Sequence, residues 1–145
     1  MELIRGIHNI RARHHGCVLT IVNFDGVHRG HEAMHDQLKL EGQRLGLPVM
    51  VMIFEPQPLE LFSSGRAPAR LTSLREKLRY LAESGVDAVL CVRFDRRFAA
   101  LTAQNFINDL LVKRLGVKYL AVGDDFRFGA GRLGDFLLLE KASEE

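Results

Sequence analysis

Val18-Leu19-Thr20-Ile21-Val22 runs directly into Asn23-Phe24-Asp25-Gly26-Val27-His28-Arg29-Gly30-His31. The apolar β-branched run predicts a strand, the glycines predict a tight loop, and the apolar residues that follow at helical spacing predict a helix over about 31–45. At the start of such a helix the backbone N–H groups are unpaired and the dipole favours an anion. This layout is typical of phosphate-binding loops, and His28 and His31 flank the same point.

The composition is that of an ordinary globular domain. With 145 residues, 47% of them hydrophobic and 26% charged, we expect one domain with its own core and no membrane span. The net charge is +2 and the basic residues are scattered, which predicts no nucleic-acid surface. Cys17 and Cys91 are far apart and lack the spacing of a metal or redox site, so we expect two buried thiols in a reducing compartment. The N-terminus lacks the apolar segment of a signal peptide, and we therefore expect a cytoplasmic location. His14 and His15 are expected to be solvated and without a role.

The same order of strand and helix repeats along the chain. Apolar runs predict further strands over 49–54, 86–92 and 117–122. Helical spacing predicts helices that begin at about 72–73 and that cover about 102–114 and 136–145. Ser73 and Glu76 would form a capping box at the start of the first of these helices. A helix after every strand predicts right-handed crossovers and a doubly wound, Rossmann-like parallel α/β sheet in a single domain. Ligands of such sheets bind beyond the carboxyl ends of the strands, which here carry loops 23–31, 55–62, 94–98 and 123–134.

Two of these loops carry residue types that suit a nucleotide and an aromatic ligand. Rigid or aromatic side chains lie at the end of the predicted strand 49–54 and in the loop after it, at Phe54, Pro56, Pro58 and Phe62. They predict a wall for a flat ring, although a core position for Phe54 is equally open. For His28 and His31 the simpler interpretation is a pair of surface imidazoles, but beside oriented amides they would form a cage for the charge of a phosphoryl group in transfer.

A competing motif is His31-Glu32-Ala33-Met34-His35, which matches the H-E-x-x-H pattern of zinc hydrolases. No histidine follows His35, so a third zinc ligand would have to be a carboxylate such as Glu55. A match of this length also arises by chance, and we treat zinc hydrolysis as the weaker hypothesis.

A second competing motif, Gly129–Gly134, spells G-x-G-x-x-G. The dinucleotide fingerprint directly follows its strand, whereas Asp124–Phe128 intervene here, so a glycine-rich loop is the better interpretation. Asp124 and Asp125 would either cap a turn or orient a phosphate or a magnesium ion.

The stretch Thr20–His31 resembles the signature of the nucleotidylyltransferase superfamily, and closely that of its flavin branch, the bacterial FAD synthetases. The likeness covers essentially the whole chain, through Phe54–Pro58, Arg70–Thr72, Arg75–Lys77 and Val122–Gly129. The resemblance implies a nucleotidylyltransferase-type domain that transfers AMP from ATP to FMN, giving FAD and pyrophosphate. It also implies Mg²⁺ bound with the ATP, and a protein that additionally phosphorylates riboflavin.

The same resemblance implies roles for individual residues. His28 and His31, with Asn23, would be catalytic, contacting the ATP phosphates and stabilising the transition state. The implied ATP-binding residues are Asn23, Phe24, Asp25, Gly26, His28, Gly30 and His31. The implied flavin-binding residues are Phe54, Pro56, Pro58, Phe62, Asp125 and Phe128. No protein ligand to a metal is assigned.

Two departures from the family pattern stand out. Val22 occupies a position where the family usually has glycine, and the chain lacks a following strand, a Ser-Ser-Thr motif and a β-barrel riboflavin kinase domain. We therefore expect residues 1–145 to be an FMN adenylyltransferase domain that is shortened at its C-terminal end. A non-catalytic flavin- or nucleotide-binding fragment is the main alternative.

Overall fold

The computed structural model describes residues 1–22, 29–55, 68–122, 128–130, 134 and 136–143. For residues 29–34, 68–74, 136–137 and 143 it describes the backbone alone.

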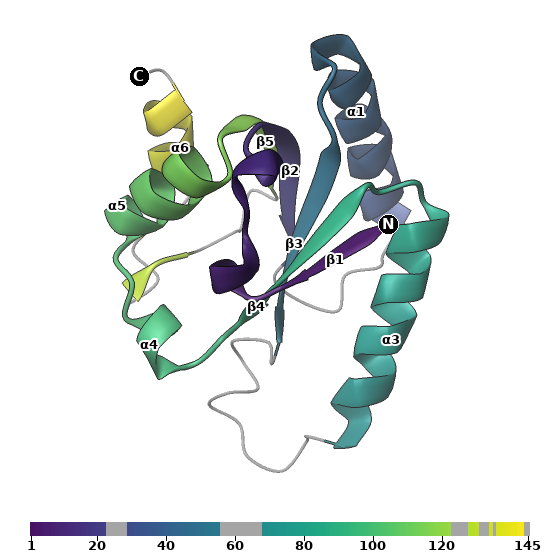
Figure 1. The fold of residues 1–145 in the computed structure, drawn as a ribbon, viewed down its shortest axis with the longest axis horizontal. Helices are drawn as coiled ribbons and strands as arrows, with labels where there is room; N and C mark the ends of the chain where they lie inside the picture. The colour runs from purple at the N-terminus through teal and green to yellow at the C-terminus, as the bar shows by residue number, and fades with distance from the viewer. Residues whose placement is uncertain (23–28, 56–67, 123–127, 131–133, 135, 144–145) are drawn as a thin grey trace.

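The centre of the molecule is a parallel sheet of five strands (Figure 1). Its strands are β1 (Glu2–Arg5), β2 (Cys17–Val22), β3 (Val49–Glu55), β4 (Ala88–Arg93) and β5 (Val117–Ala121). Their order is β1-β4-β3-β2-β5, and every neighbouring pair is parallel. The expected doubly wound α/β fold is thereby confirmed.

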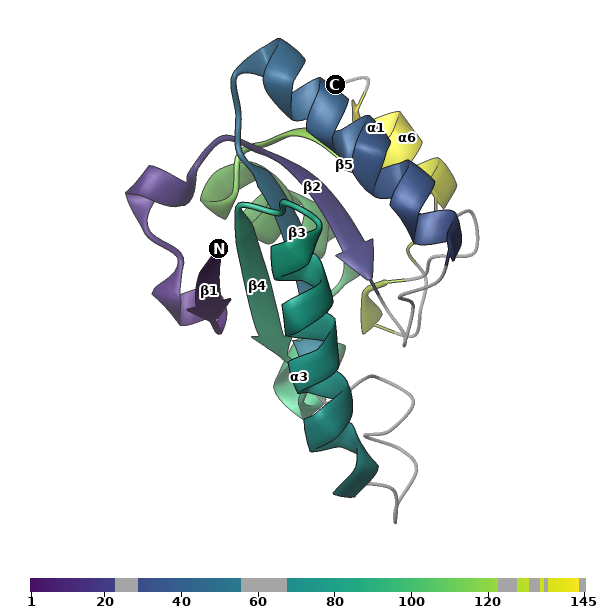
Figure 2. The same cartoon turned by 90° about the vertical axis from the view of Figure 1, so that its right-hand side faces the viewer.

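Helices cover both faces of the sheet. Figure 2 shows α1 (Arg29–Leu45) and α3 (Pro68–Glu83) on the face toward the viewer. The other face carries the short helices α4 (Arg96–Ala99) and α5 (Ala103–Asn105), the π-helix η3 (Phe106–Arg114), α6 (Phe136–Ser143) and the 3₁₀ turn η1 (Ile7–Asn9). A second 3₁₀ turn, η2 (Ala12–His14), precedes β2. No helix among the described residues is both long and apolar enough to cross a membrane.

Alternation along the central strands divides the core into two clusters. In β3, Met50, Met52 and Phe54 face the η3 side, whereas Val49, Val51 and Ile53 face α1 and α3. Successive side chains of a strand point to opposite faces, so a strand covered on both sides is apolar at every position. This explains why the strand sequences read as continuous apolar runs.

Strand β1 was not among the predicted strands. It is four residues long, within the described part of the chain it pairs with β4 alone, and among its side chains only that of Ile4 is buried. An edge strand with one buried position has no alternation that a sequence pattern could reveal.

One predicted helix start was wrong by several residues, and one short helix was not predicted. Helix α3 begins at Pro68, so Ser73 lies inside the helix and the predicted capping box does not start it. Proline suits the first position of a helix because its missing N–H would be unpaired there. The predicted loop 94–98 contains the start of α4, whose Asp95 carboxylate accepts a hydrogen bond from the Phe98 N–H at 2.8 Å.

The predicted helix over 102–114 is confirmed, with two local features. Thr102 is its N-cap, since its hydroxyl accepts the Asn105 N–H at 3.1 Å. From Phe106 onward the hydrogen bonding is that of a π-helix. The predicted strands 86–92 and 117–122 correspond to β4 and β5 with small shifts at their ends.

Candidate functional site

The topology of the sheet locates a candidate ligand site beside β2. From β2 the chain proceeds to β3 and β4 on one side, whereas β5 lies on the other side of β2. Successive strands are therefore added on opposite sides of β2, so the boundary between β2 and β5 is the point where the strand order reverses. In doubly wound sheets ligands bind outside the carboxyl ends of the strands at this reversal.

The two strands at the reversal are held together by an unusual side-chain bond. Thr20 is buried, and its hydroxyl donates a hydrogen bond to the backbone oxygen of Ala121 at 2.7 Å. Thr20 is also the register partner of Ala121. Because β2 ends at Val22 and β5 at Ala121, the predicted phosphate loop and the predicted Asp124–Asp125 segment begin at neighbouring strand ends.

Helix α1 supplies the N-terminus that the phosphate-loop hypothesis requires. It begins at Arg29, two residues earlier than the approximate start predicted, so Gly30 and His31 lie in its first turn. Unpaired N–H groups at such a helix start are suited to bind an anion. The side chain of His31 lies outside the described residues, as do the other predicted ATP-binding residues, Asn23, Phe24, Asp25, Gly26 and His28.

Val22, which replaces the usual glycine of the family, ends β2. It is paired in register with Ile53, and its half-buried side chain packs against the cluster on the α1 and α3 side. Its crowding of a bound phosphate stays a prediction.

Of the predicted flavin-binding residues, the structure describes Phe54 and Phe128. Each is 6% exposed and belongs to the cluster on the η3 side. The rings of Phe98 and Phe106 connect them: the centroids are 5.7 Å apart for Phe54 and Phe98, 6.2 Å for Phe98 and Phe106, and 5.0 Å for Phe106 and Phe128. A fifth ring, Phe94, packs on Phe54 and Phe98 with centroid distances of 5.8 Å. The core position left open for Phe54 is thus observed, and a flavin contact by either ring stays a prediction.

The remaining residues of the predicted flavin site lie outside the described part of the chain. They are Pro56, Pro58, Phe62 and Asp125. The aromatic cluster does show that the end of β3 and the segment after β5 are joined through one continuous set of rings. Sequence reasoning missed this connection because Phe94, Phe98 and Phe106 are separated in sequence from the motifs.

His35, the second histidine of the zinc motif, faces helix α3. It is 5% exposed, and its ring centroid lies 6.2 Å from that of Tyr80. Beside it a shallow cavity of about 270 Å³ is lined by His35, Asp36, Lys39, Tyr80, Glu83 and Ser84. Within the described part of the chain, no group of three or more His, Cys, Asp or Glu side chains could hold a metal ion. The surroundings of His35 thus give the zinc hypothesis no support.

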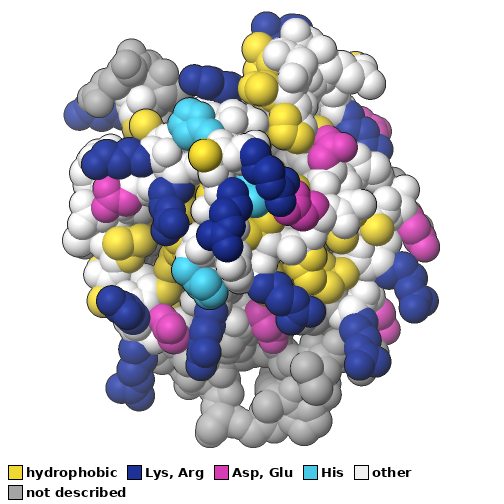
Figure 3. All heavy atoms as spheres, viewed as in Figure 1, with side chains coloured by type: hydrophobic (Ala, Val, Ile, Leu, Met, Phe, Trp, Pro, Cys, Tyr) yellow, Lys and Arg dark blue, Asp and Glu magenta, His cyan; other side chains and the backbone are white. Residues whose placement is uncertain are grey.

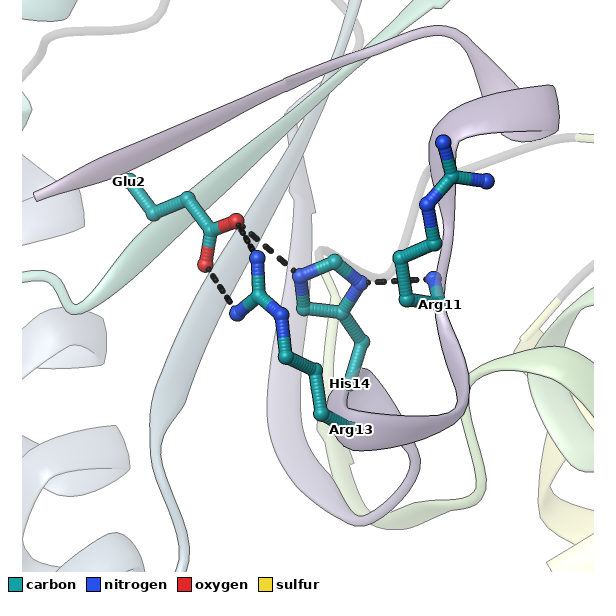
Figure 4. A network of polar contacts seen from close by, with 4 residues as sticks. All are labelled: Glu2, Arg11, Arg13 and His14. Carbon is teal, nitrogen blue, oxygen red and sulfur yellow. Dashed lines mark hydrogen bonds and ion pairs between the residues drawn. The ribbon is translucent and has the colours of Figure 1, made fainter.

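A polar network ties the N-terminal strand to η2 (Figure 4). The Arg13 guanidinium donates to both carboxylate oxygens of Glu2, at 3.0 and 2.5 Å, and Nε2 of His14 lies 3.1 Å from Glu2 Oε2. Nδ1 of His14 accepts the backbone N–H of Arg11 at 2.8 Å, so its other nitrogen carries the proton. The expectation that His14 is solvated was wrong: it is 7% exposed, because these partners satisfy its ring nitrogens inside the fold.

This network lies away from the predicted ligand site. Glu2 begins β1 and η2 directly precedes β2, so the network sits at the amino ends of the strands. Arg13 and then His14 hold the pKa of the Glu2 carboxyl at about 2 through their hydrogen bonds. We assign the network to the stability of the sheet edge rather than to chemistry.

Basic side chains that look scattered in the sequence gather in space. Figure 3 shows Lys, Arg and His side chains grouped on the face viewed in Figure 1. In the N-terminal segment the exposed basic and histidine residues are Arg5, His8, Arg11, Arg13 and His15. Arg13 is engaged by Glu2.

The two cysteines are free thiols, as expected. Cys17 is fully buried, and burial raises the pKa of its thiol to about 12. Cys91 is partly exposed, and burial followed by the charge of Glu55 raises its pKa as well. Neither thiol is activated for chemistry, because a reactive cysteine needs a lowered pKa.

Comparison with curated proteins shows extensive similarity. The bifunctional riboflavin kinase/FMN adenylyltransferase of Escherichia coli (strain K12) is 76% identical over 146 residues, which cover all of this chain and 47% of that protein. Proteins of the same name from Pseudomonas fluorescens and Haemophilus influenzae are 51% and 49% identical, covering 98% and 99% of this chain and 45% and 47% of their own lengths. The chain spans about half the length of the curated relatives it matches.

A solved structure and a family model complete the comparison. The structure, described as a macrolide-efflux protein from Streptococcus pneumoniae, is similar with a TM-score of 0.77 and 24% identity, covering 97% of this chain and 55% of its own. At this identity the likeness shows a shared fold alone. The family model described as FAD synthetase matches residues 10–145, nearly the full length of the sequence. The chain therefore belongs to the FAD synthetase family.

Proposed function

We propose that residues 1–145 form an FMN adenylyltransferase domain, which transfers AMP from ATP to FMN and releases pyrophosphate. One observation carries the proposal: the motif Asn23–His31 spans from the end of β2 to the first turn of α1, beside the reversal between β2 and β5. That is where a doubly wound sheet binds a phosphorylated ligand. The names of the curated relatives include the same activity.

The proposed chemistry needs no general base. The phosphate of FMN is largely dianionic near neutral pH, since its second pKa is about 6, and one of its oxygens attacks the α-phosphorus of ATP. A new P–O bond forms as the bond to pyrophosphate breaks, and pyrophosphate leaves with the bonding pair. The protein then contributes positioning and electrostatic stabilisation, for which the α1 amides, His28 and His31 are the proposed groups.

Mg²⁺ is proposed as the accompanying ion. It is usually held by substrate phosphates together with one or two carboxylates rather than by an all-protein cage. The carboxylates that would take part, Asp124 and Asp125, follow the end of β5. When bound, the ion would neutralise charge on the departing pyrophosphate.

ATP and FMN are the proposed partners, and no nucleic acid is proposed. We also propose a cytoplasmic location, which the two free thiols support, since disulfides are rare in reducing compartments. Riboflavin phosphorylation, which the relatives' name also includes, is not assigned to these residues.

The first experiment incubates the purified chain with ATP, Mg²⁺ and FMN, and follows FAD by chromatography and pyrophosphate by a coupled assay. Equal amounts of FAD and pyrophosphate are expected, and riboflavin in place of FMN should give no FMN. Tight binding of FMN and ATP with no pyrophosphate would favour the non-catalytic alternative.

Substitution of the histidines tests the assignment of the site. His28→Ala and His31→Ala should each lower kcat by about 10²–10³, the scale for losing one donor to developing charge, with little change in FMN affinity. His35→Ala is the matched control, because His35 faces Tyr80 on α3. Loss of activity in His35→Ala with full activity in His28→Ala, together with bound zinc, would instead support the zinc hydrolase.

A further inference from the structure

In the part of the chain between Val122 and α6, the structure describes residues 128–130 and Gly134, and Ala130 is hydrogen-bonded to Leu101 between α4 and α5 (Figure 1). Phe128 and Gly134 form an antiparallel bridge, in which the Phe128 N–H donates to the Gly134 oxygen at 3.1 Å and the Gly134 N–H donates to the Phe128 oxygen at 2.9 Å. The bridge therefore brings Phe128, directly before the Gly129–Gly134 motif, next to the last glycine of that motif. Its sequence had suggested only a glycine-rich loop.

Gly129 and Ala130 pack against Leu101 and Ala103, at the connection from α4 to α5. The N–H of Ala130 donates to the Leu101 oxygen at 2.6 Å. Gly129 has a φ of +79°, and a Cβ built on it would lie 2.5 Å from the backbone nitrogen of Ala103. This connection precedes η3, which carries Phe106, so Gly129, Ala130 and the Phe106 ring belong to one packed unit.

Gly134 has a separate steric role. A Cβ at this position would lie 2.6 Å from Cε2 and Cζ of the Phe128 ring. The backbone φ of Gly134 is not in the left-handed region, so the contact rather than the conformation excludes a side chain. The Phe128 ring therefore lies directly against the Gly134 backbone on one side and packs on Phe106, centroids 5.0 Å apart, on another.

We propose that Gly134 is a positioning residue for the flavin: by leaving room for the Phe128 ring, it sets where that ring sits at the site for the flat part of FMN. The inference rests on the proposed function, since it assumes that FMN binds at the carboxyl ends of β3 and β5. It adds a residue that touches no substrate and acts through Phe128. The rings of Phe106 and Phe98 extend the same packing toward Phe54 at the end of β3.

The test compares two glycine substitutions in the full chain. Gly134→Ala should raise the Kd for FMN, measured by quenching of flavin fluorescence, by roughly tenfold, the scale for losing one well-placed aromatic contact. The Kd for ATP, measured by calorimetry, should change by less than about twofold, because the site for the phosphates is built from other elements. Gly42→Ala is the matched control.

Gly42 suits this purpose because it shares the steric constraint but not the location. It is buried in α1, its φ is ordinary, and a Cβ on it would lie 2.9 Å from the Leu47 oxygen. Gly42→Ala should lower the melting temperature and leave both Kd values unchanged. The positioning role would be overturned if Gly134→Ala bound FMN as tightly as the unsubstituted chain. It would also be overturned if both variants lost FMN affinity and ATP affinity in parallel.

A double substitution keeps the test decisive if Gly134→Ala folds poorly. Phe128→Leu shortens the side chain that meets the new methyl group, so Gly134→Ala should have no further effect on FMN affinity in that background. Additive effects of the two substitutions would contradict the inference. An unsubstituted chain that binds no FMN would refute the proposed function and this inference together, whereas normal FMN binding by Gly134→Ala refutes the inference alone.

Discussion

Replacing His14 by alanine should destabilise the domain far more than replacing its neighbour His15. The His14 ring is buried and takes part in two hydrogen bonds, one from the Arg11 N–H at 2.8 Å and one to the Glu2 carboxylate at 3.1 Å. His15 is exposed. The pair therefore offers the same substitution at adjacent positions with opposite burial.

The magnitude follows from the two bonds. A neutral hydrogen bond contributes about 1 kcal/mol and one to a charged group about 1.5–2 kcal/mol, so His14→Ala should lower the free energy of unfolding by roughly 2–3 kcal/mol. For a domain of this size that corresponds to a fall in melting temperature of about 8–12 °C. The exposed Arg13 remains on Glu2 in this variant, and its contact is discounted for solvent screening.

The pH dependence supplies a second readout of the same network. Because the pKa of Glu2 is lowered from 4.5 to about 2 in the folded chain, its ionised form stabilises the fold above pH 4.5, and this contribution is lost as the pH falls from there toward 2. The stability difference between the unsubstituted chain and Glu2→Gln should therefore shrink between about pH 5 and pH 3. Urea unfolding followed by circular dichroism measures both effects. Equal losses for His14→Ala and His15→Ala, or a Glu2→Gln difference that does not change with pH, would refute the reasoning.

Two further predictions concern the sheet. Thr20→Val keeps the shape of the side chain but removes the hydroxyl that donates to the Ala121 oxygen, so the free energy of unfolding in urea should fall by about 1 kcal/mol. An unchanged unfolding midpoint would mean that this hydrogen bond between β2 and β5 contributes nothing to stability. Thiol labelling at pH 8 tests the burial of Cys17. A Cys91→Ser chain keeps Cys17 and should react only after unfolding, because burial raises the pKa of Cys17 to about 12, whereas a Cys17→Ser chain keeps the partly exposed Cys91 and should react measurably while folded. Rapid labelling of Cys17 in the native chain would contradict its burial.

The sequence alone predicted the class of fold and most of its elements. The apolar runs at β2, β3, β4 and β5 and the helices between them indicated a parallel sheet covered on both faces, which the structure confirms. This was possible because burial on both faces forces a strand to be apolar at every position, a property of the local sequence. The family signature at Thr20–His31 is also local, and the family comparison agrees with it.

The roles of single residues in the candidate site are less determined by the sequence. Phe54 and Phe128 matched a flavin-binding pattern, and the structure also places both in an aromatic cluster with Phe98 and Phe106, so a flavin contact by either ring stays a prediction. A phenylalanine in a motif and one in a core have the same sequence signal. Only the packing distinguishes a ring that lines a ligand site from one that supports it.

Other features depended on contacts between distant parts of the chain. Strand β1 exists because β4 offers it an edge, and His14 is buried because Glu2 and the Arg11 backbone satisfy its nitrogens. The tight fit of Gly134 against the Phe128 ring likewise accompanies the backbone bridge between these two residues. Sequence periodicity reports which residues prefer the interior, whereas partner identity, register and steric fit arise only when segments far apart in the chain are brought together.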